Sequence, residues 1–274
     1  MVAPKADADC LRPDGRDGTS AAPSTHITVR GLVKRFQGNT VYDGFDLDLP
    51  RGEIISIFGP NGCGKSTLIN MLSGILPIDG GRILFDGKTI TDTRIGYVFQ
   101  NYREALFPWM RAIDNVGYPL VLMGVAPAEI RQRIDVLVGR FDLRFDLQRY
   151  PYELSGGQQQ TVSIMRALVI EPEVLFLDEP FSALDYEMTL TMRDQLQKVL
   201  AETRTTSLLV SHDLDEAIYL GDKLLLLTRR PTRIAAFLDV SVPRPREPAT
   251  TTGPAFIALK AQALGIFQSA VRDG

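Results

Sequence analysis

Cysteine is scarce in this 274-residue chain, which contains only Cys10 and Cys63. Cys10 lies in a polar N-terminal stretch and Cys63 in a glycine-rich loop, so we expect no structural disulfide and favour a reducing compartment. The sequence also lacks an apolar run that approaches the length of a bilayer span. Its N-terminus lacks the apolar core of a secretory signal. We therefore expect neither a disulfide framework nor a membrane span.

Excess positive charge is also missing, since 30 basic and 33 acidic residues give a net charge of −3. This balance argues against a protein that binds nucleic acid through overall positive charge. The hydrophobic fraction of 45% and the charged fraction of 23% are ordinary for a globular protein. Residues 1–25 are rich in Ala, Asp, Gly, Pro and Ser and have little to bury, so we predict a disordered leader there.

A glycine-rich loop follows an apolar, β-branched stretch at 53–58, which predicts a buried strand. It precedes apolar residues at helical spacing in 66–73. The loop matches the phosphate-binding pattern G-x-x-x-x-G-K-[ST], and strand, loop and helix are the context that this pattern needs. A chance glycine-rich turn is the alternative, and the flanking elements argue against it. The predicted nucleotide-binding residues are Gly59, Pro60, Asn61, Gly62, Cys63, Gly64, Lys65, Ser66 and Thr67.

The chemistry of this loop follows from its residue types. The glycines let the backbone take positive φ angles and approach a ligand closely, so that successive N–H groups can point at phosphate oxygens. The helix that follows adds unpaired N–H donors and a favourable dipole. Lys65 supplies a positive charge for the β- and γ-phosphates, and the Ser66 hydroxyl can bind Mg²⁺.

An apolar stretch at 174–177 ends in two carboxylates, Asp178 and Glu179. In phosphoryl-transfer sites of this kind, the aspartate at the strand end holds the Mg²⁺ shell. The glutamate beside it could orient or deprotonate the attacking water. The alternative is a solvated acidic strand end, which the presence of a phosphate loop in the same chain disfavours.

Other candidate residues carry weaker signals, because each also has an ordinary structural explanation. Phe36 and Tyr42 precede the phosphate loop, and either ring could stack on adenine or pack in the core. Gln100 follows a predicted strand and could reach a metal or a water, although a surface glutamine is the commoner case. His212 follows the predicted strand 206–211 and could donate a hydrogen bond to the γ-phosphate, or could be structural.

Two further stretches have both a functional and a structural interpretation. Residues 154–158 place a serine and two glycines at a predicted helix start, which offers a second anion site or an ordinary helix cap. Residues 106–110 place large apolar side chains in a predicted loop beside helical patterns at 112–123 and 127–139. An apolar loop suggests a docking surface, and packing beneath the helices is an equally good interpretation.

Taken in order, these stretches resemble the ATP-binding subunit of an ABC transporter, and the Leu-Ser-Gly-Gly-Gln pentad at 154–158 is the most specific of them. The resemblance covers roughly residues 26–240. It implies an α/β fold with a P-loop NTPase core and mixed sheet, an N-terminal antiparallel β subdomain and an inserted helical subdomain at about 103–170. Residues 241–274 are then a linker and a C-terminal helix.

The resemblance implies a role for each matching residue. ATP is the nucleotide, and Phe36 is preferred over Tyr42 for stacking on adenine because it follows a basic pair. Glu179 is implied as the catalytic base, His212 as the switch histidine and Lys65 as the phosphate-binding cation. The implied Mg²⁺ ligands are Ser66, Gln100 and Asp178. The implied signature that contacts nucleotide is Ser155, Gly156, Gly157 and Gln158.

The resemblance also implies partners. The signature of one copy reads the γ-phosphate held by a second copy, so two ATP molecules lie between two subunits arranged head to tail. The pair drives a separate transmembrane permease and binds peripherally at the cytoplasmic face of the cell membrane, and a solute-binding protein takes part indirectly. Nucleic acid is not an expected partner. Docking to the permease is expected near Leu106, Phe107 and Trp109.

A narrower resemblance rests on Leu106-Phe107-Pro108-Trp109, on Asp114-Asn115-Val116 and on residues 150–154, which are similar to importers of nitrate, taurine and alkyl sulfonates. That group also imports a thiamine precursor and cyanate, so the solute stays open. A soluble ABC ATPase of DNA repair or the ribosome and an exporter subunit are the alternatives. One departure is Thr161, which stands where the family usually has arginine. We expect this difference to affect the rate of hydrolysis or its coupling to transport more than ATP binding.

Overall fold

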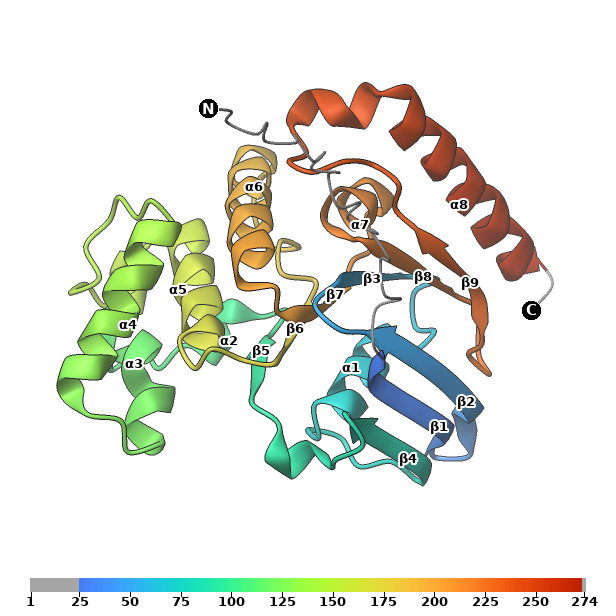
Figure 1. Cartoon of the computed structure of the whole chain (residues 1–274), viewed down its shortest axis with the longest axis horizontal. Helices are drawn as coiled ribbons and strands as arrows, with labels where there is room; N and C mark the ends of the chain where they lie inside the picture. Colours follow the sequence, from blue (N-terminus) through green and yellow to red (C-terminus); the bar gives the residue numbers. More distant parts are fainter. Residues whose placement is uncertain (1–24, 273–274) are drawn as a thin grey trace, which may run out of the picture.

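The computed structural model describes residues 25–272. A six-stranded mixed sheet forms its centre, with a three-stranded antiparallel sheet beside it and a group of helices inserted along the chain (Figure 1). This arrangement has the parts expected from the sequence. The predicted leader lies outside the described residues except for Thr25, which begins the first strand and pairs with Pro50.

The larger sheet is built around strands that are buried along their whole length. In spatial order its strands are β5 (Ile95–Val98), β6 (Val174–Asp178), β7 (Thr206–Val210), β3 (Ile54–Phe58), β8 (Lys223–Leu227) and β9 (Ile234–Asp239). All neighbours run parallel except β8 and β9, which are antiparallel. Every residue of β3, β6 and β7 is buried, which explains their near-continuous apolar sequences. Residues that follow these parallel strands therefore meet at one sheet edge.

The smaller sheet covers the helix that follows the phosphate loop. Its strands are β1 (Thr25–Phe36), β2 (Asn39–Pro50) and β4 (Gly80–Phe85), in the order β2-β1-β4. Helix α1 (Lys65–Leu72) places Leu68 in one core with Val29 of β1 and Ile57 of β3. This packing fixes the phosphate loop between the two sheets.

The helical insert lies between β5 and β6 in the chain. Its helices are α2 (Tyr102–Ala105), α3 (Ala112–Leu122), α4 (Pro127–Arg140) and α5 (Gly156–Leu168). In Figure 1, α3, α4 and α5 gather at the end of the molecule away from the three-stranded sheet. Asn115 of α3 is fully buried; its side chain accepts a hydrogen bond from Phe107 N (2.8 Å) and donates one to Met110 O (3.1 Å). The apolar loop is thereby fastened to α3.

The C-terminal part packs back on the larger sheet. Helix α6 (Tyr186–Thr203) follows β6, α7 (Leu214–Leu220) follows β7, and α8 (Pro254–Arg272) comes after β9. Short 3-10 turns lie at Ile90–Asp92, Pro151–Glu153 and Pro248–Thr252. Phe256 and Ala263 of α8 are buried, and the Phe267 ring lies 5.1 Å from that of Phe58. The predicted linker is also anchored, since Arg246 is 3% exposed.

Helix α8 corrects the expectation that no apolar run is long enough to span a bilayer. It has 19 residues, and an 18-residue window within it has a mean hydropathy of 1.2, so by length and composition alone it could cross a membrane. Its few charged residues include Lys260 and Arg272. Its contacts with the sheet account for part of this apolar character, because Phe256, Ala263 and Phe267 all pack on the domain.

Candidate functional site

The phosphate loop joins the end of β3 to α1 and has the backbone geometry that its glycines suggest. Gly62 and Gly64 have φ angles of 74° and 116°, in the region that favours glycine. A Cβ at Gly64 would lie 2.6 Å from Val41 Cγ1, so no larger residue fits there. The loop therefore needs glycine at this position for both conformation and packing.

Lys65 and the start of α1 present positive groups around the loop. The Lys65 side chain is buried, and its Nζ donates to the carbonyls of Gly59 (2.9 Å) and Pro60 (3.1 Å) across the loop. Within residues 25–272, the backbone N–H groups of Ser66 and Thr67 have no hydrogen-bond acceptor. Unpaired donors at a helix start, next to a lysine, fit a phosphate group.

Ser66 and Asp178 meet directly beside this loop. Ser66 Oγ donates a hydrogen bond of 2.9 Å to Asp178 Oδ1. Burial raises the pKa of the Asp178 carboxyl, and the neighbouring Glu179 charge raises it further, while the Ser66 hydrogen bond and the Lys65 charge lower it. A carboxylate that is costly to bury and a hydroxyl beside it are oxygen donors of the kind that Mg²⁺ prefers. The pair therefore fits the predicted metal site.

Two other predicted residues, Gln100 and His212, meet the carboxylate of Glu179. Gln100, Glu179 and His212 follow β5, β6 and β7, which are neighbours in the sheet. Gln100 Nε2 donates to Glu179 Oε2 at 2.9 Å, and His212 Nδ1 lies 3.3 Å from the same oxygen. Glu179 has a φ angle of 44°, which is uncommon for a residue other than glycine. Gln100 thus contacts the predicted base, and not Asp178.

The two candidate aromatic residues have different surroundings. Tyr42 is fully buried, and its hydroxyl donates to Gly64 O at 2.9 Å. Tyr42 therefore supports the phosphate loop from inside the core and presents no face to a ligand. Phe36 is 40% exposed, with Lys34 Nζ 5.1 Å from its ring centroid. Phe36 is the ring that remains available for stacking on adenine.

The signature residues begin α5 but lie apart from the phosphate loop. Ser155 caps the helix, accepting from Gln158 N (3.4 Å), while Gln158 Oε1 accepts from Ser155 N (3.0 Å). Gly157 is closely packed, since a Cβ there would lie 2.4 Å from Met188 Sδ. Gly157 and Gln158 line a cleft of about 400 Å³ whose lining includes none of residues 59–67. This cleft therefore does not extend to the phosphate loop of the same chain.

Thr161 occupies the position where the family usually has arginine. It is buried, and its hydroxyl donates to Gly157 O at 2.9 Å and contacts Met192 Sδ at 3.2 Å. Its polar group is therefore satisfied by its own helix, and its side chain packs against Met192 of α6.

The predicted docking loop needs one correction. Leu106 is 3% exposed and belongs to the core, so its side chain does not face a partner. Phe107 is half-buried, with its ring 5.0 Å from Tyr118 and 5.6 Å from Trp109. Trp109 is 73% exposed. The loop thus packs beneath the helices through Leu106 and presents Trp109 to its surroundings.

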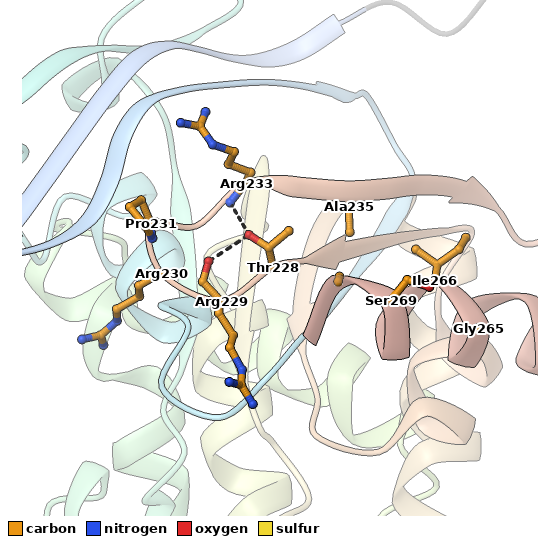
Figure 2. A pocket seen from close by; sticks show the side chains of 10 residues that line it. Thr228, Arg229, Arg230, Pro231, Arg233, Ala235, Gly265, Ile266 and Ser269 are labelled. Atoms are coloured by element: carbon orange, nitrogen blue, oxygen red, sulfur yellow. Dashed lines mark hydrogen bonds between the residues drawn. The ribbon is translucent and has the colours of Figure 1, made fainter. Parts of the chain in front are cut away.

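The turn between β8 and β9 supports the phosphate loop, and sequence reasoning missed it. The Thr232 hydroxyl donates to Cys63 O, and its N–H donates to Val41 O at 2.8 Å. Figure 2 shows this turn beside a pocket that residues of α8 also line; the pocket volume is about 680 Å³. Within the turn, Thr228 Oγ1 donates to Arg229 O and accepts from Arg233 N. No local pattern marks Thr232, because its partners lie far away in the sequence.

Comparisons with known proteins agree with this geometry. Residues 42–182 match the family described as ABC transporter. The chain is 36% identical over 249 residues to the aliphatic sulfonates import ATP-binding protein SsuB of Bacillus subtilis, covering 90% of this chain and 94% of SsuB. It is 38% identical over 208 residues to the Fe(3+) ions import ATP-binding protein FbpC of Escherichia coli O157:H7, covering 74% of this chain but only 59% of FbpC.

Solved structures give the same result. CbiO1 of Clostridium perfringens, described as part of the ABC transporter complex CbiONQ, has a TM-score of 0.71 and 30% identity over 79% of this chain and 90% of CbiO1. The dimeric bacterial ABC transporter cassette MJ0796 has a TM-score of 0.68 and 27% identity over 78% of this chain and 98% of that cassette.

The fold and the site thus define a P-loop ATPase of the cassette type, which confirms the expected fold class. The chain belongs to the ABC transporter ATP-binding family, and it is an ATP-binding ATPase. Importer relatives named for sulfonates, Fe(3+) ions and spermidine/putrescine match at similar identities of 36%, 38% and 41%. The broad resemblance is therefore confirmed, whereas the narrower one to nitrate and taurine importers is not.

Proposed function

We propose that the chain hydrolyses Mg²⁺-bound ATP as the motor subunit of an ABC importer. One observation carries the catalytic assignment: Glu179 receives both Gln100 and His212 at the sheet edge where Ser66 and Asp178 also meet. Mg²⁺ would neutralise charge on the phosphates, held by Ser66 and Asp178 with Gln100 close by. The residues of this edge all follow parallel strands or the phosphate loop.

Each residue then has a defined task. Lys65 exchanges its contacts with the loop carbonyls for the β- and γ-phosphates, and the free N–H groups of Ser66 and Thr67 hold phosphate oxygens. Glu179 orients and deprotonates the attacking water. His212, which already lies near Glu179, donates to the γ-phosphate. Phe36 stacks on adenine through its exposed face.

The remaining assignments concern partners. The signature at 155–158 binds the γ-phosphate held by a second copy, which gives it a ligand that its own chain does not supply. The pair docks on a permease at the cytoplasmic face of the membrane through Trp109 and Phe107. The match to SsuB over nearly its whole length supports an importer of a small anionic, sulfonate- or nitrate-like solute. Domain limits of 26–240 and 241–274 belong to the same proposal.

The catalytic assignment is tested by ATP turnover of purified variants. Lys65→Ala should abolish tight ATP binding and hydrolysis while the protein stays folded, because it removes the buried positive charge that lies across the loop. Lys198→Ala is the matched control, since Lys198 is exposed on α6. Unchanged turnover in Lys65→Ala would rule the assignment out.

The solute is tested separately by uptake. Cells that lack the gene should lose uptake of a labelled alkyl sulfonate, taurine or nitrate and keep uptake of Fe(3+) and spermidine. Restoration by the wild-type chain, but not by Glu179→Gln, would support the importer assignment. Loss of Fe(3+) or spermidine uptake alone would contradict the proposed solute class and leave the ATPase assignment intact.

A further inference from the structure

The short loop 211–213 joins β7 to α7 and carries His212 to the catalytic edge. The His212 side chain is itself 55% exposed, and its Nδ1 lies 3.3 Å from Glu179 Oε2. The residues on either side of it hold the loop. Ser211 is fully buried, and Asp213 begins α7 by accepting hydrogen bonds from the N–H groups of Asp215 and Glu216.

Ser211 is fixed by a carboxyl group from the first turn of α7. Its Oγ contacts Glu216 Oε2 and accepts a hydrogen bond from Asp213 N at 3.0 Å. The same Oγ lies 3.0 Å from Asp213 O, to which it can also donate. A hydroxyl has a single proton, so it cannot donate to Glu216 and to Asp213 O at once.

The protonation state of Glu216 therefore decides the direction of these hydrogen bonds. A neutral Glu216 donates to Ser211 Oγ, and the Ser211 proton then goes to Asp213 O, so every contact around the loop is satisfied. An ionised Glu216 can only accept a hydrogen bond, so the Ser211 hydroxyl donates to it and no longer donates to Asp213 O. The loop that carries His212 therefore has more of its hydrogen bonds formed when Glu216 is neutral than when it is ionised.

The surroundings of Glu216 favour the neutral form. Its side chain is nine-tenths buried, and within the described chain its Oε1 has no hydrogen-bond partner. The pKa of Glu216 is raised to about 7, chiefly by burial and also by the Asp213 charge, although the Ser211 hydrogen bond, His212 and Arg193 act to lower it. Arg193 reaches this region from α6, with its guanidinium 3.6 Å from the Tyr219 ring centroid.

The other charged groups nearby are engaged elsewhere or reach solvent. Lys260 of α8 pairs with Asp215 on the neighbouring position of α7 at 2.7 Å. A cleft of about 440 Å³ is lined by Glu216, Arg193, His212 and by Phe181 and Ser182, which follow Glu179. This cleft lets protons exchange with solvent and places Glu216 next to the catalytic edge.

We propose that Glu216 is a positioning residue for ATP hydrolysis, which acts through Ser211 to hold the loop of His212 against Glu179 and does so in its neutral form. The inference rests on the proposed role of His212. Glu216 touches neither the phosphate loop nor the predicted metal ligands, so its effect falls on kcat and not on the KM for ATP.

The expected pH dependence follows from the direction of the pKa shift. Below about pH 7 Glu216 is neutral and the loop is held; as the pH rises through 7 the group ionises and turnover falls. Glu216→Gln presents a permanent N–H donor to Ser211, so this variant should keep its turnover at pH 8. Glu216→Ala and Ser211→Ala should lower kcat roughly five- to tenfold at pH 6, as for the loss of an orienting hydrogen bond, and the difference from wild type should narrow as the pH rises through 7.

The experiment measures kcat and KM for ATP from pH 6 to 9 in wild type, Glu216→Gln, Glu216→Ala, Ser211→Ala and His212→Ala. Glu202→Gln is the control, because Glu202 is exposed on α6. A Glu216→Gln profile that stays flat where the wild-type profile falls would support the inference. Superimposable profiles, or a changed KM with an unchanged kcat, would overturn it.

A second readout separates positioning from folding. The chain has only two histidines, so the imidazole NMR signals of His212 can be assigned by comparison with His26→Gln. At about pH 8 these signals should lie closer to those of a solvent-exposed imidazole in wild type than in Glu216→Gln, because only the variant then keeps the full hydrogen bonding of the loop. If His212→Ala keeps full turnover, the proposed role of His212 fails; if it is inactive while the Glu216 profiles superimpose, only this inference fails.

Discussion

Thr232, on the turn between β8 and β9, donates a hydrogen bond from its side chain to the backbone carbonyl of Cys63 in the phosphate loop. Thr232 is 2% exposed, and its N–H donates to Val41 O at 2.8 Å. Val41 in turn lies where a Cβ on Gly64 would fall. Thr232 thus contacts both the predicted phosphate loop and the β2 residue that packs beside Gly64.

Thr232→Val should therefore loosen the phosphate loop. The substitution keeps the shape and removes the hydroxyl, leaving Cys63 O without a buried donor at a cost of about 1–3 kcal/mol in the free energy of unfolding. We expect a raised KM for ATP, measured in the ATPase assay. Thr232→Ser keeps the hydroxyl and is the control; equal KM values for the serine and valine variants would contradict the prediction.

Arg246 should contribute strongly to stability although it lies in a predicted linker. Its guanidinium donates to the carbonyls of Ile218 (2.9 Å), Tyr219 (2.8 Å) and Gly221 (2.7 Å) at the end of α7. Burial lowers its pKa to about 10, so it stays charged at neutral pH. Arg246→Met leaves these carbonyls unpaired and should lower the free energy of unfolding by about 2–4 kcal/mol.

Urea denaturation measures this loss. Arg144→Met is the matched control, because the Arg144 side chain is 85% exposed and pairs with Asp142 at the surface. A surface pair of this kind contributes little. If the two variants lose equal stability, the linker is not anchored through Arg246.

The phosphate loop and the strand-end residues could be predicted from the sequence because their chemistry is local. Glycine spacing, a lysine and an apolar strand before carboxylates lie within a few residues of one another. The parallel order of the strands then brings Gln100, Glu179 and His212 together. Even so, the contact of Gln100 with Glu179, and not with Asp178, depends on side-chain directions that no spacing reveals.

The supporting residues could not be predicted, because their partners are backbone carbonyls far away in the sequence. Thr232 and Arg246 look like ordinary residues of a turn and a linker, and neither belongs to a motif. The burial of Leu106 could not be predicted for a different reason: the sequence pattern of an apolar residue in a loop is the same whether its side chain is buried or exposed. Only the packing of α3 against the loop distinguishes it from Trp109.

Trp109→Ala should weaken association with the permease and leave the isolated subunit folded. The Trp109 side chain is largely exposed and touches Phe107, so its removal creates no internal cavity. An aromatic anchor at an interface contributes about 1–3 kcal/mol. Co-purification with the permease measures the loss, and Ile257→Ala on the exposed side of α8 is the control. If Trp109→Ala unfolds the subunit or matches the control, the docking assignment fails.

The last prediction concerns the pairing of two copies. One chain offers two helix starts suited to anions, at Ser66 and at Ser155, but a single carboxylate pair to serve one nucleotide. The signature cleft includes no residue of the phosphate loop of its own chain. Facing the signature toward the ATP of a second copy gives it a ligand, and two-fold symmetry then produces two equal sites.

Removing the base should leave both sites filled with ATP that is not hydrolysed. Glu179→Gln keeps the shape that Gln100 and His212 contact and removes the acceptor of the water proton, so it should form a dimer that requires ATP and Mg²⁺. Adding Ser155→Arg should dissolve the dimer, because the larger side chain blocks the shared γ-phosphate. Gln262→Arg, on the exposed side of α8, adds the same charge elsewhere and should leave the dimer intact.

Light scattering and sedimentation with and without ATP distinguish the outcomes. A Glu179→Gln protein that stays monomeric at saturating ATP would show that the isolated subunits form no stable sandwich. A double variant that still dimerises would place the signature outside the interface. Because Ser155 caps α5, its loss costs about 1 kcal/mol of stability by itself. The melting temperature of the double variant must therefore be measured alongside, and a folded monomer is the result that supports signature-to-nucleotide pairing.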